Sequence, residues 1–565
     1  MDARRAAHVL ARISGLLQLS GTDKFRARAY VGAADAVRAL GSDDIAPLYR
    51  SGELAQLPGV GPATLSVLAE LVETGESSYL ERLLESVPEG LLQVARVPGL
   101  TPVKAALLHS EIGIESLDDL EKAARDGRLG TVRGFGDKTV KRVLKGIQVV
   151  RGRAGRLLYR QALIEAEQSA IQILQHPDVV RVDAAGEVRR IADVVRDIVV
   201  VAECSAEPSR VLRELGRTAG VLQAEMRSNN TMHLRFVDDA EIDVSCAAPK
   251  MFPLALWRAT GSAEHVHQVE ERATSLGMAI GGVGSEPISS EHQLYERLGL
   301  QYIEPELREG LGEVDAAARH ALPQLIQAND IRGVLHCHSD YSDGSVSIAE
   351  MAAAARDRGW SFLGISDHSM AAFYAGGLKP DDVRRQHEEI DKLNSEWPEF
   401  RILKGIECDI LADGELDYDA TLRDSFEYII GSIHSRFSMD RETMTARILE
   451  AMDDPRLTIL AHPTGRLLLQ REPYAVDLDA VIEKAVATGV TLELNADPAR
   501  LDLDWRWCKK AKERGARIEI GPDAHSPRGL DHTFFGVQLA RKAWLTAEDV
   551  LNTRSAAEIV AIAHR

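Results

Sequence analysis

The stretch GVLHCHSDYSDG, residues 333–344, places two histidines and an aspartate directly after a short apolar run. The same arrangement returns in five later segments: FLGISDHS (362–369), ILKGIECDI (402–410), YIIGSIHS (428–435), TILAHPTG (458–465) and IEIGPDAHS (518–526). Each apolar run is typical of a β-strand, and helical patterns lie between the runs. Strand ends near residues 335, 365, 406, 433, 461, 494 and 522 predict a seven-stranded parallel (β/α) barrel, in which the C-terminal ends of the strands meet at one mouth.

Polar side chains at these strand ends are therefore expected to share one pocket. Imidazole and carboxylate together suit Zn²⁺, Mn²⁺ or Fe²⁺, and a close cluster of such ions can activate water for displacement at phosphorus. For a single histidine, a buried and hydrogen-bonded core position is the better interpretation. Here six of seven strand ends carry a histidine or a carboxylate, and each would need a separate structural explanation. The candidates are His336, His338, Asp343, Asp367, His368, Glu407, His434, His462, Asp523 and His525.

The motifs LHCHSDYSDG, ISDHS, GIECDI, GSIHS, AHP and PDAHS resemble the PHP (polymerase and histidinol phosphatase) domain family over residues 331–565. The resemblance implies three divalent metal ions, Mn²⁺ or Zn²⁺ or a mixture, held by nine ligands. It assigns one ion to His336, His338, Glu407 and Asp523, a second to Glu407, His434 and His462, and the third to Asp343, His368 and His525. Arg436 and Arg466 follow two of the motifs and are candidate phosphate clamps, with surface salt bridges as a nearly equal alternative.

Length and composition place the chain among multidomain globular proteins. Its 565 residues predict three or four domains, and no apolar run approaches the ~20 residues that span a bilayer. The five cysteines show no CxxC spacing, and the N-terminal segment lacks the apolar block of a secretory signal. We therefore expect reduced thiols, no membrane partner and a cytoplasmic location.

The net charge of −19 argues against a nucleic-acid partner, but a local basic stripe is what phosphate binding requires. Residues 136–156, GDKTVKRVLKGIQVVRGRAGR, form such a stripe with a single acidic residue. A solvated helix face is the simpler interpretation of this stripe alone. Its basic residues are Lys138, Lys141, Arg142, Lys145, Arg151, Arg153 and Arg156.

Three glycine-rich turns favour DNA binding over a merely solvated helix face. QLPGVGPATL, residues 56–65, fits a helix-hairpin-helix turn, in which glycine permits a tight bend and N–H groups at the next helix start face a DNA phosphate. RVPGLTPVKAALL (96–108) and VRGFGDKTVKRVL (132–144) resemble second and third copies. The candidate DNA-binding residues are Gly59, Gly61, Gly99, Gly134, Gly136 and Lys138.

The segment AGEVRRIADVVRDIVVVAE, residues 185–203, resembles the palm of family X DNA polymerases, and EIDVSCA (241–247) resembles the strand with the third catalytic aspartate. ATGSAEH (259–265) resembles the nucleotide-pocket Thr-Gly-Ser element, and residues 298–317 resemble the linker before a PHP domain. The resemblance assigns catalytic roles to Asp197 and Asp243. It assigns nucleotide binding to Arg190, Thr260, Gly261 and Ser262.

Three departures predict a polymerase site that is dead or nearly so. Val199 occupies the position of the second catalytic aspartate, Glu187 replaces the serine that touches the triphosphate, and Arg196 replaces a glycine. Nucleotidyl transfer needs carboxylates that hold two Mg²⁺ ions, so Val199 argues against Mg²⁺ binding at the palm. The competing interpretation is that Glu203 or Asp193 supplies the missing ligand, but Asp193 lies before the strand and Glu203 lies toward its far end. The lyase lysine of some family members is also absent, because Val67 occupies that position.

Together the resemblances indicate a bacterial family X DNA polymerase fused to a PHP domain. We expect a multidomain α and α/β protein: a helical DNA-binding domain with a helix-hairpin-helix at 1–85, a fingers-like second hairpin region at 86–155, an α+β nucleotidyltransferase-like palm at 156–245, a thumb-like region at 246–320, a linker at 321–330 and a PHP-type barrel at 331–565.

The favoured hypothesis is a DNA-repair-type enzyme that binds recessed, gapped or nicked DNA at the bacterial nucleoid. Its barrel would act as a metal-dependent 3′–5′ exonuclease or 3′-end phosphoesterase. One alternative is a small-molecule phosphatase of the histidinol-phosphatase type with vestigial DNA-binding modules. Another is a DNA-binding scaffold with structural metals. The complete ligand set argues against the scaffold, and the hairpins and basic stripe argue against the phosphatase. The oligomeric state stays open.

Overall fold

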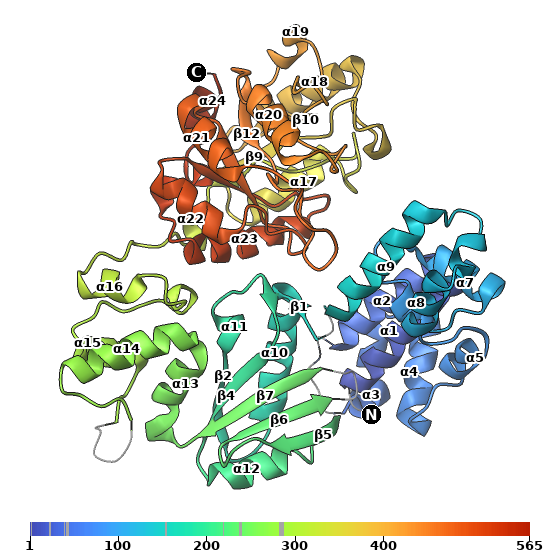
Figure 1. The fold of residues 1–565 in the computed structure, drawn as a ribbon, viewed down its shortest axis with the longest axis vertical. Helices are drawn as coiled ribbons and strands as arrows, with labels where there is room; N and C mark the ends of the chain where they lie inside the picture. Colours follow the sequence, from blue (N-terminus) through green and yellow to red (C-terminus); the bar gives the residue numbers. More distant parts are fainter. Residues whose placement is uncertain are drawn as a thin grey trace.

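A computed structural model describes residues 1–564 except 2, 22, 23, 39, 41–43, 153, 154, 219, 237–239 and 282–286. A barrel forms one end of the molecule, and a sheet with flanking helices lies below it (Figure 1). A separate bundle of helices from the N-terminal part of the chain stands beside the sheet (Figure 1). None of the described helices is long and apolar enough to cross a membrane.

The N-terminal bundle is held together by one apolar core. Its first helix is amphipathic, and side chains such as Leu10, Ile13 and Leu16 are fully buried against the following helices. Glycine in the left-handed region ends several of these helices, as Gly75 does after α4 and Gly113 after α7. The helices are α1 (Ala3–Ser20), α2 (Lys24–Arg38), α3 (Ala46–Ser51), α4 (Pro62–Thr74), α5 (Ser78–Ser86), α6 (Leu91–Val94), α7 (Pro102–Ile112), α8 (Leu117–Arg125) and α9 (Asp137–Gly152).

A five-stranded sheet of order β2-β4-β7-β6-β5 forms the palm-like unit. Its central strands β4 and β7 run parallel, and the other pairs are antiparallel. The elements are β1 (Leu157–Leu158), α10 (Tyr159–Leu174), β2 (Val179–Ala185), α11 (Gly186–Arg189), β3 (Val194–Val195), β4 (Ile198–Cys204), α12 (Pro208–Leu215), β5 (Val221–Met226), β6 (Thr231–Phe236) and β7 (Glu241–Ala247).

Helices α13 (Phe252–Thr260), α14 (Ala263–Ser275), α15 (Glu291–Arg297) and α16 (Glu313–Ala318) form a thumb-like unit around the buried Trp257 and Tyr295. The segment 321–330, expected to be a linker, packs against both units that it connects. Leu325 belongs to the core of the thumb-like unit and Ile326 to the core of the barrel, so an apolar pair joins the two units here.

Seven parallel strands in the order β14-β13-β12-β11-β10-β9-β8 form the C-terminal barrel, which confirms the predicted fold class. A parallel bridge between Cys337 and Ala524 nearly closes it. The strands are β8 (Gly333–Val334), β9 (Phe362–Ile365), β10 (Arg401–Asp409), β11 (Tyr428–Ser432), β12 (Leu457–Leu460), β13 (Thr491–Asn495) and β14 (Ile518–Gly521). The surrounding helices are α17 (Ile348–Asp357), α18 (Pro380–Glu396), α19 (Ala420–Arg423), α20 (Arg441–Ala451), α21 (Leu478–Thr488), α22 (Trp505–Glu513), α23 (His532–Lys542) and α24 (Ala556–Ala563).

Tyr428 fills the barrel interior beneath the mouth. Its hydroxyl donates to the carbonyl of Leu335 at 2.6 Å, and its ring lies over two glycines. A Cβ atom at Gly364 would lie 2.3 Å from the Tyr428 hydroxyl, and one at Gly405 would lie 2.1 Å from its ring. These positions therefore need glycine for the tyrosine to fit, and the packed floor leaves the polar strand ends at the mouth.

The barrel is docked on the palm-like and thumb-like units through buried polar contacts. Lys542 of α23 is buried and donates to the carbonyl of Arg190 at 2.7 Å. Arg541 lies 2.5 Å from Glu306, and Arg466 lies 3.3 Å from Asp193. Complementary charges placed across the junction fix the register of the docked units, although much of their attraction is offset by the cost of removing them from water.

Candidate metal centre

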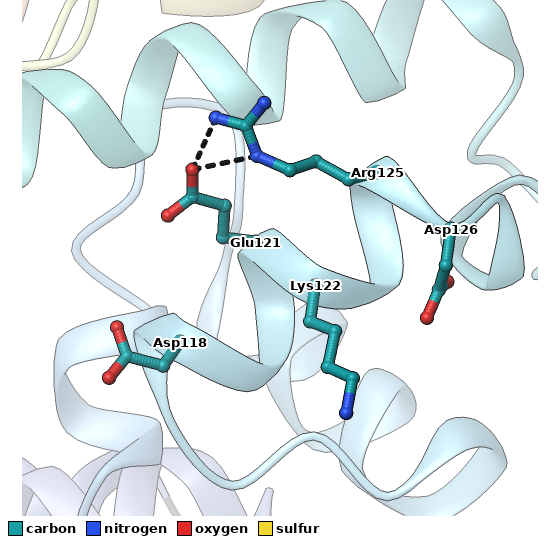
Figure 2. Close-up of a pocket in the computed structure, with 5 residues that line it drawn as sticks. All are labelled: Asp118, Glu121, Lys122, Arg125 and Asp126. Atoms are coloured by element: carbon teal, nitrogen blue, oxygen red, sulfur yellow. Dashed lines mark hydrogen bonds and ion pairs between the residues drawn. The ribbon is translucent and has the colours of Figure 1, made fainter.

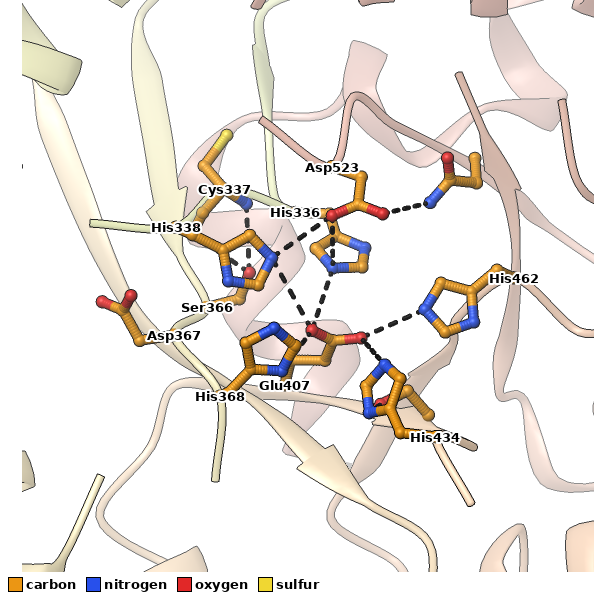
Figure 3. A network of polar contacts seen from close by, with 12 residues as sticks. His336, Cys337, His338, Ser366, Asp367, His368, Glu407, His434, His462 and Asp523 are labelled. Carbon is orange, nitrogen blue, oxygen red and sulfur yellow. Dashed lines mark hydrogen bonds and ion pairs between the residues drawn. The ribbon is translucent and has the colours of Figure 1, made fainter. Parts of the chain in front are cut away.

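The carboxylate of Glu407 lies in the middle of five imidazoles at the mouth of the barrel (Figure 3). Its Oε2 atom lies 3.0 Å from Nδ1 of His368, 3.4 Å from Nε2 of His336 and 3.6 Å from Nε2 of His338. Its Oε1 atom lies 3.1 Å from Nε2 of His462 and 3.3 Å from Nε2 of His434. Glu407 lies inside β10, because this strand extends to Asp409, past the predicted end near residue 406. One carboxylate therefore faces two groups of imidazoles on opposite oxygens.

The remaining predicted ligands complete the cluster. Asp523 Oδ1 lies 3.3 Å from Nε2 of His338, and Asp343 Oδ1 lies 3.3 Å from Nε2 of His525. The other ring nitrogen of His338 faces Asp343 at 3.7 Å, and so does Nε2 of His368. The structure thus brings all nine predicted residues into one continuous cluster. Their assignment to three particular ions stays a prediction.

Divalent cations fit this donor set. Atoms that share an ion with bonds of about 2.0–2.2 Å lie roughly 3–3.5 Å apart, which is close to the separations here. Several of these buried atoms have no hydrogen-bond partner among the described residues: Nε2 of His336, both ring nitrogens of His338, Nδ1 of His368 and Oε2 of Glu407. An unpaired buried polar atom costs about 1–3 kcal/mol, so five at one point indicate a cluster built for cations.

A second layer of acceptors orients the ligand imidazoles. Glu493 on β13 accepts from Nδ1 of His336 at 2.5 Å and from the backbone N–H of His462, also at 2.5 Å. Asp409 accepts from Nδ1 of His434 at 2.6 Å. Carboxylates of this kind fix the ring orientation and the tautomer of a metal-binding histidine. Neither carboxylate was among the predicted site residues.

Asp367 has a different role from its neighbour His368. Its carboxylate accepts from the backbone N–H of Ser339 at 2.8 Å, from the Ser339 hydroxyl at 2.6 Å and from Nε2 of Gln386 at 2.6 Å. The hydroxyl of Ser342 donates to it as well. Asp367 therefore holds the loop between His338 and Asp343 in place, and its oxygens are occupied by these donors.

Electrostatics divides the imidazoles into two groups. Burial lowers the pKa of His338 and of His462 to about 4, which keeps both rings neutral. Burial also disfavours a charge on His434, but Glu407 and Asp409 outweigh it and raise the pKa of His434 to about 10. The pKa of Glu407 lies well below its ordinary value, because the imidazoles around it outweigh its burial. The cluster is thus anionic at its centre, and cation binding at such a site releases protons from the charged rings.

Three cationic side chains lie near the cluster, and they differ in what they contact. Nε of Arg500 lies 3.5 Å from Oδ2 of Asp523, which places this guanidinium at the edge of the cluster. Arg466 is turned to Asp504 at 3.2 Å, to Asp193 at 3.3 Å and to two backbone carbonyls. Arg436 is exposed, with a left-handed backbone (φ 58°). The clamp roles of Arg436 and Arg466 stay predictions, and Arg500 is a candidate that the sequence analysis missed.

The three glycine-rich turns share one conformation. Gly59, Gly99 and Gly134 have φ angles of 92°, 89° and 92°, in the left-handed region that favours glycine. The residue after each glycine donates to the carbonyl three residues back, at 3.1, 2.8 and 3.0 Å. A helix begins within two or three residues after each of them, at Pro62, Pro102 and Asp137. Three equivalent turns that precede helix N-termini are the geometry expected of a backbone-binding hairpin, and Gly61 and Gly136 lie in the two outer turns.

The basic stripe follows helix α9. Lys138, Lys141, Arg142 and Lys145 are exposed on it, whereas Arg151 pairs with Asp118 and Glu121 of α8. Arg156 is exposed, and Arg153 lies outside the described residues. The stripe therefore offers four cations from α9 beside the third turn.

A surface hollow of about 460 Å³ lies along α8 (Figure 2). It is lined by Asp118, Glu121, Lys122, Arg125 and Asp126. Arg125 is engaged by Glu121 at 2.5 Å, and the lining has both charge signs on one short helix. Nothing in it resembles the converging donors of the barrel mouth, so we place the chemistry at the mouth.

In the palm-like unit, the residues that resemble catalytic carboxylates have other partners. Val199 on β4 is paired in register with Asp243 on β7. Asp243 accepts from Arg227 at 2.8 Å and from Nδ1 of His233 at 2.9 Å, so both of its oxygens face protein cations or donors. Asp197 is exposed just before β4.

The predicted nucleotide-binding residues lie at the junction of the palm-like and thumb-like units. Nη1 of Arg190 donates to the carbonyl of Thr260 at 2.7 Å, and Nε of Arg190 lies 3.2 Å from Glu309. The Ser262 hydroxyl caps α14, with Gly261 between it and the end of α13. These contacts hold the junction together, and nucleotide binding by these residues stays a prediction.

Comparison with known families agrees with this architecture. Residues 1–77 match the helix-hairpin-helix domain family, and residues 89–148 match the SAM-like helix-hairpin-helix tandem family. Residues 255–309 match the DNA polymerase beta thumb, and residues 335–497 match the PHP domain. The fold and site thus define a family X DNA polymerase that carries a C-terminal PHP domain.

Individual relatives narrow the class. The chain is 34% identical to the DNA polymerase/3′-5′ exonuclease PolX of Bacillus subtilis, over the whole length of both chains. A probable phosphatase of Syntrophotalea carbinolica is 26% identical over 39% of this chain and 90% of its own length. A probable phosphatase of Clostridium acetobutylicum is 27% identical over 34% of this chain and 78% of its own. The chain belongs to the PolX family.

Proposed function

We propose that this PolX-family protein processes the 3′ ends of DNA by metal-dependent phosphoester hydrolysis in its barrel. The proposed reaction is 3′–5′ exonuclease or 3′-end phosphoesterase activity on recessed, gapped or nicked DNA, in the bacterial cytoplasm. One observation carries the proposal: nine imidazole and carboxylate side chains form one cluster with Glu407 at its centre, and several of their buried ligand atoms have no hydrogen-bond partner among the described residues. The repeated hairpin turns and the exposed cations of α9 support DNA as the substrate.

The residues fit distinct tasks in such a reaction. Bound divalent ions would supply Lewis-acid polarisation of a phosphoryl oxygen and a water of lowered pKa. Glu407 and the surrounding imidazoles would hold the ions, with Glu493 and Asp409 fixing ring orientation. Arg500, at the edge of the cluster, would bind a non-bridging phosphate oxygen, because a guanidinium offers donors in the geometry that phosphate accepts.

We propose further that nucleotidyl transfer by the palm is lost or very weak. A hydrophobic side chain at Val199 removes one ligand for the metal pair, and Arg227 and His233 occupy Asp243. The carboxylate of Glu187 accepts from the backbone N–H of Arg196 at 2.6 Å, so it places negative charge where the triphosphate of a nucleotide would bind.

The two residues considered as substitutes do not fit the missing position. Glu203 lies four residues beyond Val199 on the same strand, which is about 13 Å away at roughly 3.3 Å per residue. Asp193 faces Arg466 of the barrel. Neither carboxylate is therefore available beside Asp243 in this arrangement.

A small-molecule phosphatase is the second candidate, because two relatives that match 39% and 34% of this chain are named probable phosphatases. The two functions differ in salt dependence. Binding to a DNA backbone weakens steeply with added salt, whereas binding of one small phosphomonoester changes little in comparison. The hairpins and α9 favour the DNA-directed function.

The test is a 5′-labelled recessed-primer duplex incubated with Mn²⁺, with and without deoxynucleoside triphosphates, beside His338→Ala as the control. Shortening of the primer that the variant loses, without extension when triphosphates are present, is the expected result. Extension by the wild-type protein would refute the loss of polymerase activity. An unchanged primer together with hydrolysis of a small phosphomonoester would replace the nuclease proposal by the phosphatase.

A further inference from the structure

Two adjacent aromatic side chains stand exposed beside the metal-ligand cluster. Phe373 and Tyr374 lie in the short 3-10 helix η6 (Phe373–Ala375), five and six residues after the ligand His368. Phe373 is 86% exposed and Tyr374 is 62% exposed. The Tyr374 ring centre lies 6.4 Å from that of His368 and 6.2 Å from that of His434, so Tyr374 borders the cluster directly.

Tyr374 connects Phe373 to this position. The two rings meet edge to face, with centres 6.1 Å apart and planes inclined by 78°. Phe373 is therefore one ring further from the ligand imidazoles than Tyr374. The two rings thus form a continuous aromatic surface that extends outward from the mouth of the barrel.

The backbone presents these rings in a fixed way. The N–H of Ala371 donates to Asp417 at 2.7 Å, and the N–H of Ala372 donates to the carbonyl of Ser369 at 3.0 Å. The segment returns through Gly377, where a Cβ atom would lie 2.0 Å from the Ser369 carbonyl oxygen, and Leu378 donates to the carbonyl of His368 at 2.9 Å. The exposure of Phe373 is thus set by an anchored turn that begins and ends at the ligand loop.

The size of the apolar surface decides what kind of occupant it fits. Along this turn, the exposed apolar side chains are Phe373, Tyr374 and Met370, which is 47% exposed. A stable protein interface buries about 1,200–2,000 Å² in total, far more than three side chains supply. One or two flat aromatic groups match the surface, and nucleobases stack on exposed aromatic side chains in single-stranded nucleic-acid sites.

We propose that Phe373 and Tyr374 form the subsite for the unpaired terminal nucleobase of the DNA strand whose phosphate lies at the metal centre. This inference rests on the proposed function and adds to it a preference for frayed or single-stranded 3′ ends. A terminal base that is still paired is hydrogen-bonded to its partner and stacked on its inner neighbour, so it must give up both interactions before it can move onto Phe373. Stacking discriminates little between base types, because every base has a flat aromatic face.

The test compares Phe373→Ala, Phe373→Trp and wild type on two single strands that differ only at the 3′-terminal residue. One strand ends in thymidine, and the other ends in a tetrahydrofuran abasic residue. Loss of stacking should lower kcat/KM of Phe373→Ala on the thymidine strand by about 5- to 150-fold, the range for one stacked base. On the abasic strand the same variant should match wild type, and Phe373→Trp should match wild type on both.

Phe534→Ala serves as the matched control, because Phe534 is a phenylalanine of α23 with 46% exposure. It should leave both rates unchanged. Equal losses for Phe373→Ala on both strands would overturn the subsite, since they would show damage to the metal centre. Unchanged rates on both strands would overturn it too, and so would a change of oligomeric state in light scattering. If wild type cleaves neither strand while its metal content is complete, the proposed function itself fails, which is distinguishable from failure of the subsite alone.

Discussion

Replacing Glu493 with glutamine tests whether one buried carboxylate positions two metal ligands. A carboxylate only accepts hydrogen bonds, so its 2.5 Å contact requires that Nδ1 of His336 carry the proton and leaves Nε2 free for an ion. The second oxygen accepts the N–H of His462 at 2.5 Å and Nδ2 of Asn495 at 3.3 Å. Glutamine keeps one acceptor and turns the other into a donor, which then meets an N–H group.

The size of the effect follows from this count. A buried donor without an acceptor costs about 1–3 kcal/mol, and losing the carboxylate charge weakens the bond that remains. Since roughly 1.4 kcal/mol corresponds to a factor of ten, we expect metal affinity and kcat/KM to fall about 10- to 100-fold, the range observed for outer-layer partners of metal-binding histidines. Competition with a chromophoric chelator measures the affinity, and elemental analysis measures the metal content.

The neighbouring strand supplies a matched control. Glu519 on β14 is paired in register with Glu493 and is equally buried, but its side chain accepts a hydrogen bond from Nδ2 of Asn552 at 3.3 Å instead of from a ligand imidazole. Burial, together with the charge of Glu493, raises the pKa of Glu519 to about 8, so glutamine resembles the form present at neutral pH. Glu519→Gln should keep its metal. Equal losses in both variants, or an unaffected Glu493→Gln, would refute the positioning argument.

Other measurements test other parts of the molecule. The double variant Val199→Asp/Glu187→Ser should extend a primer about 100-fold faster than wild type, which is the effect of losing one catalytic group in other enzymes. Wild-type extension as fast as that of the variant would contradict an inactive palm. Alanine at the three exposed lysines of α9 should lower the slope of log affinity against log salt for duplex DNA by about 3, and an unchanged slope would exclude these lysines from phosphate contact. Arg500→Ala should lower kcat/KM by about 100-fold with full metal content; loss of metal instead would make Arg500 a structural partner of the cluster. Glu519 has a pKa of about 8 in the folded barrel and an ordinary pKa of 4.5 in the unfolded chain. Because the folded state holds this proton more tightly, the free energy of unfolding should fall by about 1.4 kcal/mol for each unit that pH rises between these values. Melting temperatures of Glu519→Gln should lack this component, and parallel wild-type and variant profiles would refute it.

The ligand cluster could be predicted because its residue types are unusual where they occur. A histidine or carboxylate directly after an apolar run has few structural explanations, and a parallel barrel brings all strand ends to one mouth. Glu493 was within reach of the same reasoning, since it interrupts the apolar run TLELN and a charged residue inside a strand buried on both faces needs a partner. Asp409 lies two residues after Glu407 on the same strand, so both side chains point to the same side, which also indicated that Asp409 lies near the ligands.

The position of Arg500, and the contacts of Arg227 and His233 with Asp243, could not be predicted from motifs at strand ends. Arg500 lies in the loop after β13, and its approach to Asp523 depends on how that loop folds across the mouth. His233 reaches Asp243 from the neighbouring strand β6, and Arg227 reaches it from the residue after β5, so both contacts depend on strand register. The packed segment 321–330 escaped prediction for a similar reason, because Leu325 and Ile326 insert into two different cores that only the tertiary structure brings together.

Two residues that were candidates for separate sites in the sequence form an ion pair with each other in the structure. Arg466 follows a barrel motif and was a candidate for phosphate, and Asp193 precedes a palm strand and was a candidate for Mg²⁺. They lie 3.3 Å apart across the junction of the two units, with side chains largely buried. Each charge therefore has a partner from the other unit, which competes with the ligand that its own unit would suggest. The same holds for Arg190, whose guanidinium faces Glu309 while its carbonyl accepts from Lys542 of the barrel. Palm residues that resemble parts of a polymerase site thus also contact the barrel and the segment before it, and these contacts hold the barrel against the palm.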